Sequence, residues 1–218
     1  MKVKKSKTPW TTARVMEQIY NQQLWGTSSS KYYSGYGSHQ EDLVRPYIQE
    51  VGSFLKSFSV PVSLCDLGCG DFNVGRQLLP FVGHYYGIDI VPDLIDYNTR
   101  KYQAENLSFH CLDIEKDQLP QASVVIIRQV LQHLSNEAIL TVLEKLEAYS
   151  YLLVTEHLPK GAFTPNLDIL TGQGIRLKHQ SGVNLEQAPF SLSFASKRTL
   201  LSLEDPKEGR IETVLYTR

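Results

Sequence analysis

The chain has 218 residues, of which 42% are hydrophobic and 21% are charged, and its formal net charge at pH 7 is −1. This composition is typical of a globular protein with one sizeable core, and the balanced charge argues against a broad binding surface for nucleic acid or anionic membrane. No window approaches the roughly 18 apolar residues that a membrane-spanning helix needs.

The ends and the cysteines predict a cytoplasmic protein without a metal site. The basic start "MKVKKSKT" is followed by "PWTTARVMEQIYNQQ", which has no apolar block, so we predict no secretory signal. Cys65, Cys69 and Cys111 are odd in number and match no zinc spacing, which favours reduced thiols.

Residues 1–60 are expected to form a helical cap or lid. The apolar spacing of residues 11–25 predicts a short helix, and the Ser-, Gly- and Tyr-rich stretch that follows predicts a loop. Ser38 and Glu41 have the spacing of a capping box for a second helix, whose apolar face includes residues from Val44 to Phe58.

Residues 61–218 are expected to form one α/β domain. Strand-like runs, "VSLCDL", "HYYGIDI", "LSFHCL", "SVVIIR" and "YLLVTE", alternate with helical stretches near 73–80, 93–104 and 135–148. The last two runs, "KRTLLSL" and "RIETVLYT", flank the turn-like "EDPKEGR". The pattern predicts a seven-stranded Rossmann-like sheet, mostly parallel, with an antiparallel terminal hairpin.

The stretch "SLCDLGCGDFNVG" (63–75) places a glycine turn after the first strand of this domain. A dinucleotide fingerprint would need its third glycine two positions earlier than Gly75. Asp66 and Asp71 flank the turn, and carboxylates there disfavour a pyrophosphate. The ammonium and sulfonium groups of S-adenosylmethionine fit this charge better.

Two further acidic residues follow the next strands. Asp89 ends "YYGIDI" and is placed to accept hydrogen bonds from ribose hydroxyls, which a dinucleotide and an adenosyl cofactor both present. Asp113 follows the third strand and can accept from the amine of an adenine, with Ile90 and Ile114 against the ring faces.

With these residues in place, the chain resembles the class I S-adenosylmethionine-dependent methyltransferases over about residues 62–156. The resemblance rests on "DLGCGDF", "GIDIVPDLI", "CLDIE" and "IIRQVLQHLSN". It implies that Asp66, Gly68 and Gly70 surround the methionyl part, with Cys69 as a small neighbour. It further implies that Asp89 holds the ribose and that Asp113 and Ile114 hold the adenine. The backbone of Arg128 and Gln129 would meet the methionyl ammonium.

The flanks are similar to one branch of bacterial and viral methyltransferase-like sequences. The shared features are Trp25, "SGYGS" (34–38), "PNLDI" (165–169), Arg176, Leu185 and "PF" (189–190). Many of these relatives have an acidic residue in place of Gln129, so the implied contact there is through the backbone.

Candidate catalytic and substrate residues lie at the same end of the predicted sheet. His133 follows the fourth strand and is a candidate general base, substrate ligand or helix cap, while Tyr33 is a second catalytic candidate in the predicted lid. The candidate substrate residues are Trp25 and Tyr32 in the lid, Glu156 and His157 at the end of the fifth strand, and Arg176 in the later loop. Each has a structural alternative: ring packing, capping of loop amides, or a solvated loop face.

The sequence therefore predicts methyl transfer from S-adenosylmethionine to an oxygen or nitrogen atom of a small molecule. Three alternatives remain open: a protein or nucleic-acid methyltransferase, a non-catalytic protein that binds the adenosyl cofactor, and a nicotinamide-dependent enzyme.

Overall fold

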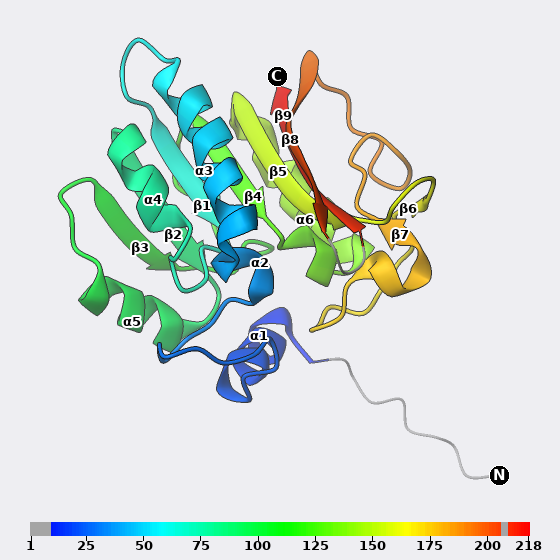
Figure 1. The fold of residues 1–218 in the computed structure, drawn as a ribbon, viewed down its shortest axis with the longest axis horizontal. Coiled ribbons are helices and arrows are strands. Elements are labelled where there is room, and N and C mark those ends of the chain that lie inside the picture. Colours follow the sequence, from blue (N-terminus) through cyan, green and yellow to red (C-terminus); the bar gives the residue numbers. More distant parts are fainter. Residues whose placement is uncertain (1–9, 206–208) are drawn as a thin grey trace.

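A computed structural model describes residues 10–205 and 209–218 and shows a central sheet with helices on both faces (Figure 1). The seven strands run in the order β3-β2-β1-β4-β5-β9-β8. Their bounds are Ser63–Leu67 (β1), His84–Asp89 (β2), Leu107–Cys111 (β3), Val124–Arg128 (β4), Tyr151–Leu158 (β5), Ser196–Asp205 (β8) and Gly209–Thr217 (β9). Strands β1 to β5 are parallel, and β9 runs antiparallel between β5 and β8. The predicted fold is confirmed; residues 206–208 of the predicted turn lie outside the described residues.

The helices cover the two faces of the sheet through two apolar clusters. One cluster joins the sheet to residues of α1, α5 and α6, and the other joins it to α3 and α4. The bounds are Thr12–Asn21 (α1), Tyr36–His39 (α2), Glu41–Lys56 (α3), Gly75–Leu78 (α4), Pro92–Lys101 (α5) and Asn136–Lys145 (α6), with short 3-10 helices at Leu79–Phe81, Leu131–His133, Leu146–Ala148 and Arg176–His179.

Several elements begin where the local sequence predicts. Pro92 opens α5, where its fixed φ and missing N–H cost nothing. Ser135 is the N-cap of α6, and its side chain accepts a hydrogen bond from the backbone N–H of Ala138. The four consecutive buried residues 124–127 of β4 reflect a strand that is covered on both faces.

The predicted capping box at Ser38 and Glu41 is wrong. Helix α3 begins at Glu41 behind Gln40, and no side chain caps it. Ser38 belongs to the separate turn α2, where its carbonyl oxygen accepts from Asn73 Nδ2 at 2.7 Å. Ser38 is part of α2 and is therefore not the N-cap of α3.

The N-terminal segment divides into two parts. Helices α1 and α2 lie at the end of the sheet where the parallel strands finish (Figure 1), whereas α3 packs on the sheet face through Tyr47, Val51 and Leu55. The region between β5 and β8 also contains a two-stranded sheet, β6 (Thr164–Pro165) with β7 (Ser181–Gly182). Strands of two residues have no measurable periodicity, so the sequence does not reveal them.

Candidate functional site

A cavity of about 580 Å³ lies at the carboxyl ends of the parallel strands. Such ends are the usual ligand site of an open α/β sheet, at the point where the strand order reverses. Here the reversal falls between β1 and β4, and the cavity extends from the end of β3 across to β5 and the β8–β9 hairpin. Ten of the predicted site residues line it: Trp25, Gly68, Gly70, Asp89, Ile90, Ile114, Arg128, Gln129, His133 and His157.

The glycine turn brings the backbone to the cavity wall. Gly68 has φ +81° and Gly70 has φ +55°, which favour glycine. A Cβ atom at Gly70 would stand 2.3 Å from Ser34 Oγ, and one at Gly68 would stand 2.4 Å from Val130 Cγ2. Because Gly68 and Gly70 have no side chains, the N-terminal segment and the chain after β4 can pack closely against the turn.

Asp89 is a buried carboxylate on the cavity wall. Its oxygens accept hydrogen bonds from the backbone N–H groups of Gly70 and Val91, both at 3.1 Å. Burial raises the pKa of Asp89 to about 6, and the nearby charge of Asp71 adds to the shift. The carboxylate is thus held rigidly at the end of β2 and carries negative charge at neutral pH.

The other two carboxylates of the turn face away from this cavity. Asp66 accepts a hydrogen bond from the Tyr85 hydroxyl at 2.6 Å, and burial raises its pKa to about 7. Asp71 accepts from the Ser34 backbone N–H at 3.3 Å and contacts His39 Nε2 at 2.6 Å. They add negative potential around the turn without lining the main cavity.

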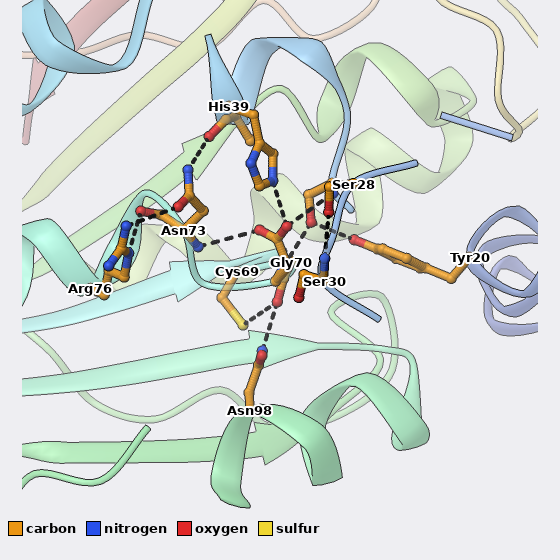
Figure 2. Close-up of polar contacts among 12 residues, drawn as sticks. Tyr20, Ser28, Ser30, His39, Cys69, Gly70, Asn73, Arg76 and Asn98 are labelled. Atoms are coloured by element: carbon orange, nitrogen blue, oxygen red, sulfur yellow. Dashed lines mark hydrogen bonds and ion pairs between the residues drawn. The ribbon is translucent and has the colours of Figure 1, made fainter. Parts of the chain in front are cut away.

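A clasp formed by Ser34, His39 and Asp71 joins the N-terminal segment to the glycine turn. The Ser34 hydroxyl accepts from the Asp71 backbone N–H at 2.7 Å and contacts the Tyr20 hydroxyl at 3.0 Å. Figure 2 shows Tyr20 and His39 pointing toward the turn, while Asn98 of α5 holds the Gly70 carbonyl oxygen from the other side at 2.7 Å. The clasp places segment 34–38 on the cavity wall.

Arg128 and Gln129 lie where β4 ends. The Arg128 guanidinium donates to the Gly37 carbonyl oxygen at 2.7 Å, and its Nε is buried without a hydrogen-bond acceptor in the described part of the chain. Gln129 has φ +57°, and its backbone N–H donates to the Thr155 carbonyl oxygen at 2.7 Å. That N–H is therefore already engaged, and a ligand ammonium, which donates hydrogen bonds, would need carbonyl oxygens instead. The Gln129 side chain and the Arg128 guanidinium add further polar groups to this wall.

Apolar side chains line the end of the cavity near β3. Ile90 and Ile114 lie there with Leu112 and with Met16 of α1. Asp113 does not line the cavity: its carboxylate accepts from the Glu115 backbone N–H at 3.0 Å and pairs with Lys116. Ile90 and Ile114 thus line the cavity, whereas Asp113 does not.

His133 and Trp25 form a wall at the opposite end. Their ring centroids lie 5.1 Å apart, and the indole Nε1 is a buried donor without a hydrogen-bond acceptor among residues 10–205 and 209–218. Burial lowers the pKa of His133 to about 4, so its imidazole is neutral at neutral pH. Nδ1 contacts the Gly172 carbonyl oxygen at 3.2 Å, which requires the proton on Nδ1 and leaves the lone pair on Nε2.

Two predicted substrate residues hold loops instead of facing the cavity. The Glu156 carboxylate accepts from the backbone N–H groups of Leu131 and Gln132 at 3.1 and 2.9 Å, and burial raises its pKa to about 8. Arg176 is only 1% exposed and donates to backbone carbonyls and to Asn136. Those carbonyl oxygens belong to Leu131, Gln132, Leu134 and Leu167.

The remaining predicted residues pack beside the cavity without lining it. Tyr32 is buried, with its ring against Tyr97 at 5.2 Å, and Tyr33 stacks on His39 at 4.4 Å. The Cys69 thiol contacts the Gly70 carbonyl oxygen at 3.8 Å, and burial raises its pKa well above the usual range. These groups support the turn and the clasp.

Sequence reasoning missed Gln132, Ser34 and Asp205, which all line the cavity. Gln132 connects two predicted residues, because its Oε1 accepts from the His157 backbone N–H at 3.1 Å and its Nε2 lies 3.4 Å from His133 Nε2. Asp205 was assigned to the turn between the last strands. The one sequence signal that could have identified Gln132 is that "LQHL" directly follows the end of a strand.

Two broader findings concern the described ranges only. None of their helices combines the length and apolar character needed to cross a membrane. They also contain no group of three or more histidine, cysteine, aspartate and glutamate side chains arranged to hold a metal ion.

Part of the chain matches a known protein family. Residues 64–149 match the methyltransferase domain family. Malonyl-[acyl-carrier protein] O-methyltransferase of Acetivibrio thermocellus is 27% identical over 107 residues, which are 48% of this chain and 37% of that protein. The match thus spans well under half of the curated relative's length.

Solved structures share the fold over nearly the whole chain. Human N-acetylserotonin methyltransferase in complex with S-adenosylmethionine aligns with a TM-score of 0.55 at 16% identity, covering 96% of this chain and 60% of that one. Magnesium protoporphyrin IX methyltransferase of Synechocystis PCC 6803, also with S-adenosylmethionine bound, aligns with a TM-score of 0.57 at 15% identity, covering 97% and 100%. At these identities the likeness establishes the fold.

Proposed function

We propose that this chain, whose residues 64–149 match a methyltransferase domain, transfers a methyl group from S-adenosylmethionine to an oxygen or nitrogen atom of a small molecule. One observation carries the proposal: a single cavity joins the glycine turn and the buried Asp89 to a separate polar end at His133 and His157. The first end suits an adenosyl donor and the second an acceptor.

The residues present fit the cofactor. Arg128 Nε is a buried donor on a cavity residue that lacks an acceptor in the described ranges, so a ligand with an acceptor group would satisfy it. In this proposal the Arg128 guanidinium would bind the methionyl carboxylate, and Asp89 would accept hydrogen bonds from the ribose hydroxyls. Ile90 and Ile114 supply apolar contact for the adenine.

When bound, S-adenosylmethionine supplies a methyl carbon that is already activated by the positive sulfur. The protein therefore has to orient the acceptor and exclude water. Segment 34–38 and α1 cover the cavity and would do the latter, since the clasp at Asp71 holds them against the turn. This enclosure also favours a small acceptor over a macromolecule.

Cofactor affinity should rise with pH between 5 and 7. Asp89 binds hydroxyls best when ionised, and its raised pKa of about 6 means that most of it is protonated at pH 5. Binding at pH 5 must then release that proton, so we expect affinity to increase about 10-fold from pH 5 to pH 7. Calorimetry at both pH values in two buffers of different ionisation enthalpy measures the affinity and the proton release.

The Asp89→Asn variant is the control for this pH dependence. Asp66 and Glu156 also have raised pKa values, about 7 and about 8, and titrate over a neighbouring range. An asparagine at position 89 should remove the slope below pH 6 and leave any contribution from those groups. The same slope in wild type and variant would contradict the role of Asp89.

Calorimetry and a product assay test the function itself. We expect S-adenosylmethionine and S-adenosylhomocysteine to bind, and NAD and ATP not to bind, because three carboxylates surround the turn. Incubation with the cofactor and a panel of small alcohols, phenols and amines should produce S-adenosylhomocysteine. Transfer to an RNA or a protein substrate alone would favour the macromolecular alternative, and firm NAD binding without cofactor binding would overturn the proposal.

A further inference from the structure

The end of β4 brings a side-chain amide to the middle of the cavity. In sheet order the cavity runs from β3 and β2, where Asp89 lies, through β1 and β4 to β5, where His157 lies. Gln129 directly follows β4 and lines the cavity between these two residues. Under the proposed function this position is the junction between the adenosyl cofactor and the acceptor.

The backbone of Gln129 has an uncommon conformation. Its φ of +57° lies in the left-handed region, which residues with a Cβ atom rarely adopt. The backbone N–H donates to the Thr155 carbonyl oxygen of β5, so the sheet holds the residue in place. Such conformations persist where the surrounding structure imposes them, and they are concentrated at functional sites. The side chain therefore projects from a fixed point on the cavity wall.

Two neighbours determine the orientation of the Gln129 carboxamide. Arg128 Nη1 donates to Gln129 Oε1 at 3.2 Å, so the oxygen faces Arg128. Gly37 packs against the same group, because a Cβ atom there would stand 2.1 Å from Oε1 and 2.8 Å from Nε2. The carboxamide thus lies between Arg128 and the bare backbone of Gly37. Its orientation depends on segment 34–38 being closed over the cavity.

The amide nitrogen of Gln129 remains unpaired by the protein. Nε2 donates no hydrogen bond to any residue whose structure is described, whereas Oε1 already accepts from Arg128. Unlike Arg128 Nε, this nitrogen is not buried, and Gln129 lines the cavity. The side chain therefore offers a donor to a ligand. A carbonyl or carboxylate oxygen can accept from it, whereas a protonated amine has no lone pair with which to do so.

The buried polar groups at the acceptor end are already engaged. His133 Nδ1 contacts a backbone carbonyl oxygen at 3.2 Å, and Gln132 Oε1 accepts from the His157 backbone N–H at 3.1 Å. His157 Nε2 and Asp205 Oδ2 lie 3.2 Å apart. In contrast, Gln129 Nε2 has no partner in the described structure, and it can bind a ligand without breaking a contact.

We propose that Gln129 is a specificity-determining residue of the acceptor site and that the acceptor carries a carbonyl or carboxylate oxygen close to its methylated atom. This inference rests on the proposed function. Gln129 Nε2 donates a hydrogen bond to that oxygen, and Arg128 and Gly37 are the positioning residues that hold the carboxamide. The acceptor is thereby recognised only when segment 34–38 covers the cavity.

Nitrogen–proton NMR of the full chain saturated with S-adenosylhomocysteine tests the donor without methyl transfer. Gln129→Met identifies the Gln129 side-chain amide signals by their absence. Acetate, a carboxylate probe, or acetamide, a carbonyl probe, should shift these signals, and the probe that does so identifies the oxygen group. Methylammonium should not shift them, and the exposed Gln103 amide is the control that should respond to none of the three. Gln129 signals that respond to neither oxygen probe, or equally to methylammonium, would overturn the proposal.

The Gly37→Ala variant tests the positioning of the carboxamide. The added methyl group would displace the Gln129 side chain, so its amide signals should no longer respond to the oxygen probe that shifts them in wild type. An unchanged response in a folded Gly37→Ala protein would overturn the positioning role of Gly37.

Matched phenols test the selectivity by calorimetry on the same complex. The probes meta-hydroxybenzoate and meta-hydroxyacetophenone carry the oxygen group, and meta-ethylphenol lacks it. Wild type should bind at least one of the first two about 5-fold or more tighter than meta-ethylphenol, and Gln129→Met should lose that preference. A preference that survives in Gln129→Met, or a wild type that shows none, would overturn the proposal. Failure of wild type to bind S-adenosylhomocysteine would instead overturn the proposed function, and calorimetry measures this before any probe is added.

Discussion

Replacing Asp89 with asparagine should weaken S-adenosylmethionine binding by about 100-fold or more. The carboxylate lies at the end of β2 on the cavity wall, and under the proposed function it accepts hydrogen bonds from two ribose hydroxyls. Hydrogen bonds to a charged group contribute about 1.5–3 kcal/mol each, and an amide offers one acceptor where the carboxylate offers two. Isothermal calorimetry at pH 7.5 measures the change.

The control for this variant is Asp93→Asn. Asp93 is an exposed acid in the first turn of α5, four residues along the chain, so its loss should leave affinity within about twofold. Because Asp89 also accepts from the N–H groups of Gly70 and Val91, thermal unfolding of the variant should be followed in parallel. A folded Asp89→Asn protein with wild-type affinity would contradict the proposed contact between Asp89 and the ribose.

Replacing Arg176 with alanine should destabilise the fold by about 3 kcal/mol or more. The guanidinium donates to four backbone carbonyls from two separate segments, and each buried acceptor left unpaired costs about 1–3 kcal/mol. For a chain of this size the melting temperature should fall by about 6–12 °C. A thermal scan measures it, and His179→Ala, an exposed residue of the same turn, should change it by less than 2 °C.

A lysine at position 176 separates the two roles that the sequence left open for this residue. A substrate ligand needs the positive charge, which lysine keeps. A bridge between carbonyls needs the planar fork of donors, which lysine lacks. We therefore expect Arg176→Lys to lose most of the same stability. If Arg176→Lys kept full stability but had reduced methyl transfer, Arg176 would instead be a substrate ligand.

The clasp between the N-terminal segment and the turn gives the cavity its enclosure. Ser34 and Asp71 exchange two hydrogen bonds, and His39 contacts the same carboxylate. Asp71 thereby serves the cap, although its position beside the glycine turn suggested a direct role toward the ligand. Asp71 still affects the cavity electrostatically, because its negative charge raises the pKa of Asp89.

The order and type of the elements were predictable because their signals are local. Alternating apolar runs and helical spacing identified the seven strands and the main helices, and Pro92 and Ser135 marked two helix starts correctly. The glycine turn was also recognisable, since positive φ at Gly68 and Gly70 is a demand on single residues. The same local reading failed at Ser38, where a short helix intervened.

The direction of each strand-end side chain was decided by tertiary structure alone. The sequence placed Asp66, Asp89, Glu156 and Arg176 at one end of the sheet, but only Asp89 faces the cavity. A buried polar group takes whichever partner lies within hydrogen-bond reach. For Asp66, Glu156 and Arg176 those partners lie 19 to 45 positions away in the chain, apart from Leu167, which is nine positions from Arg176. The contact of Asp205 with His157 depends likewise on β9 lying between their strands and on Gly209 having no side chain. Short-range pattern therefore determined the fold and the cofactor turn, whereas long-range pairing determined which charges the ligand meets.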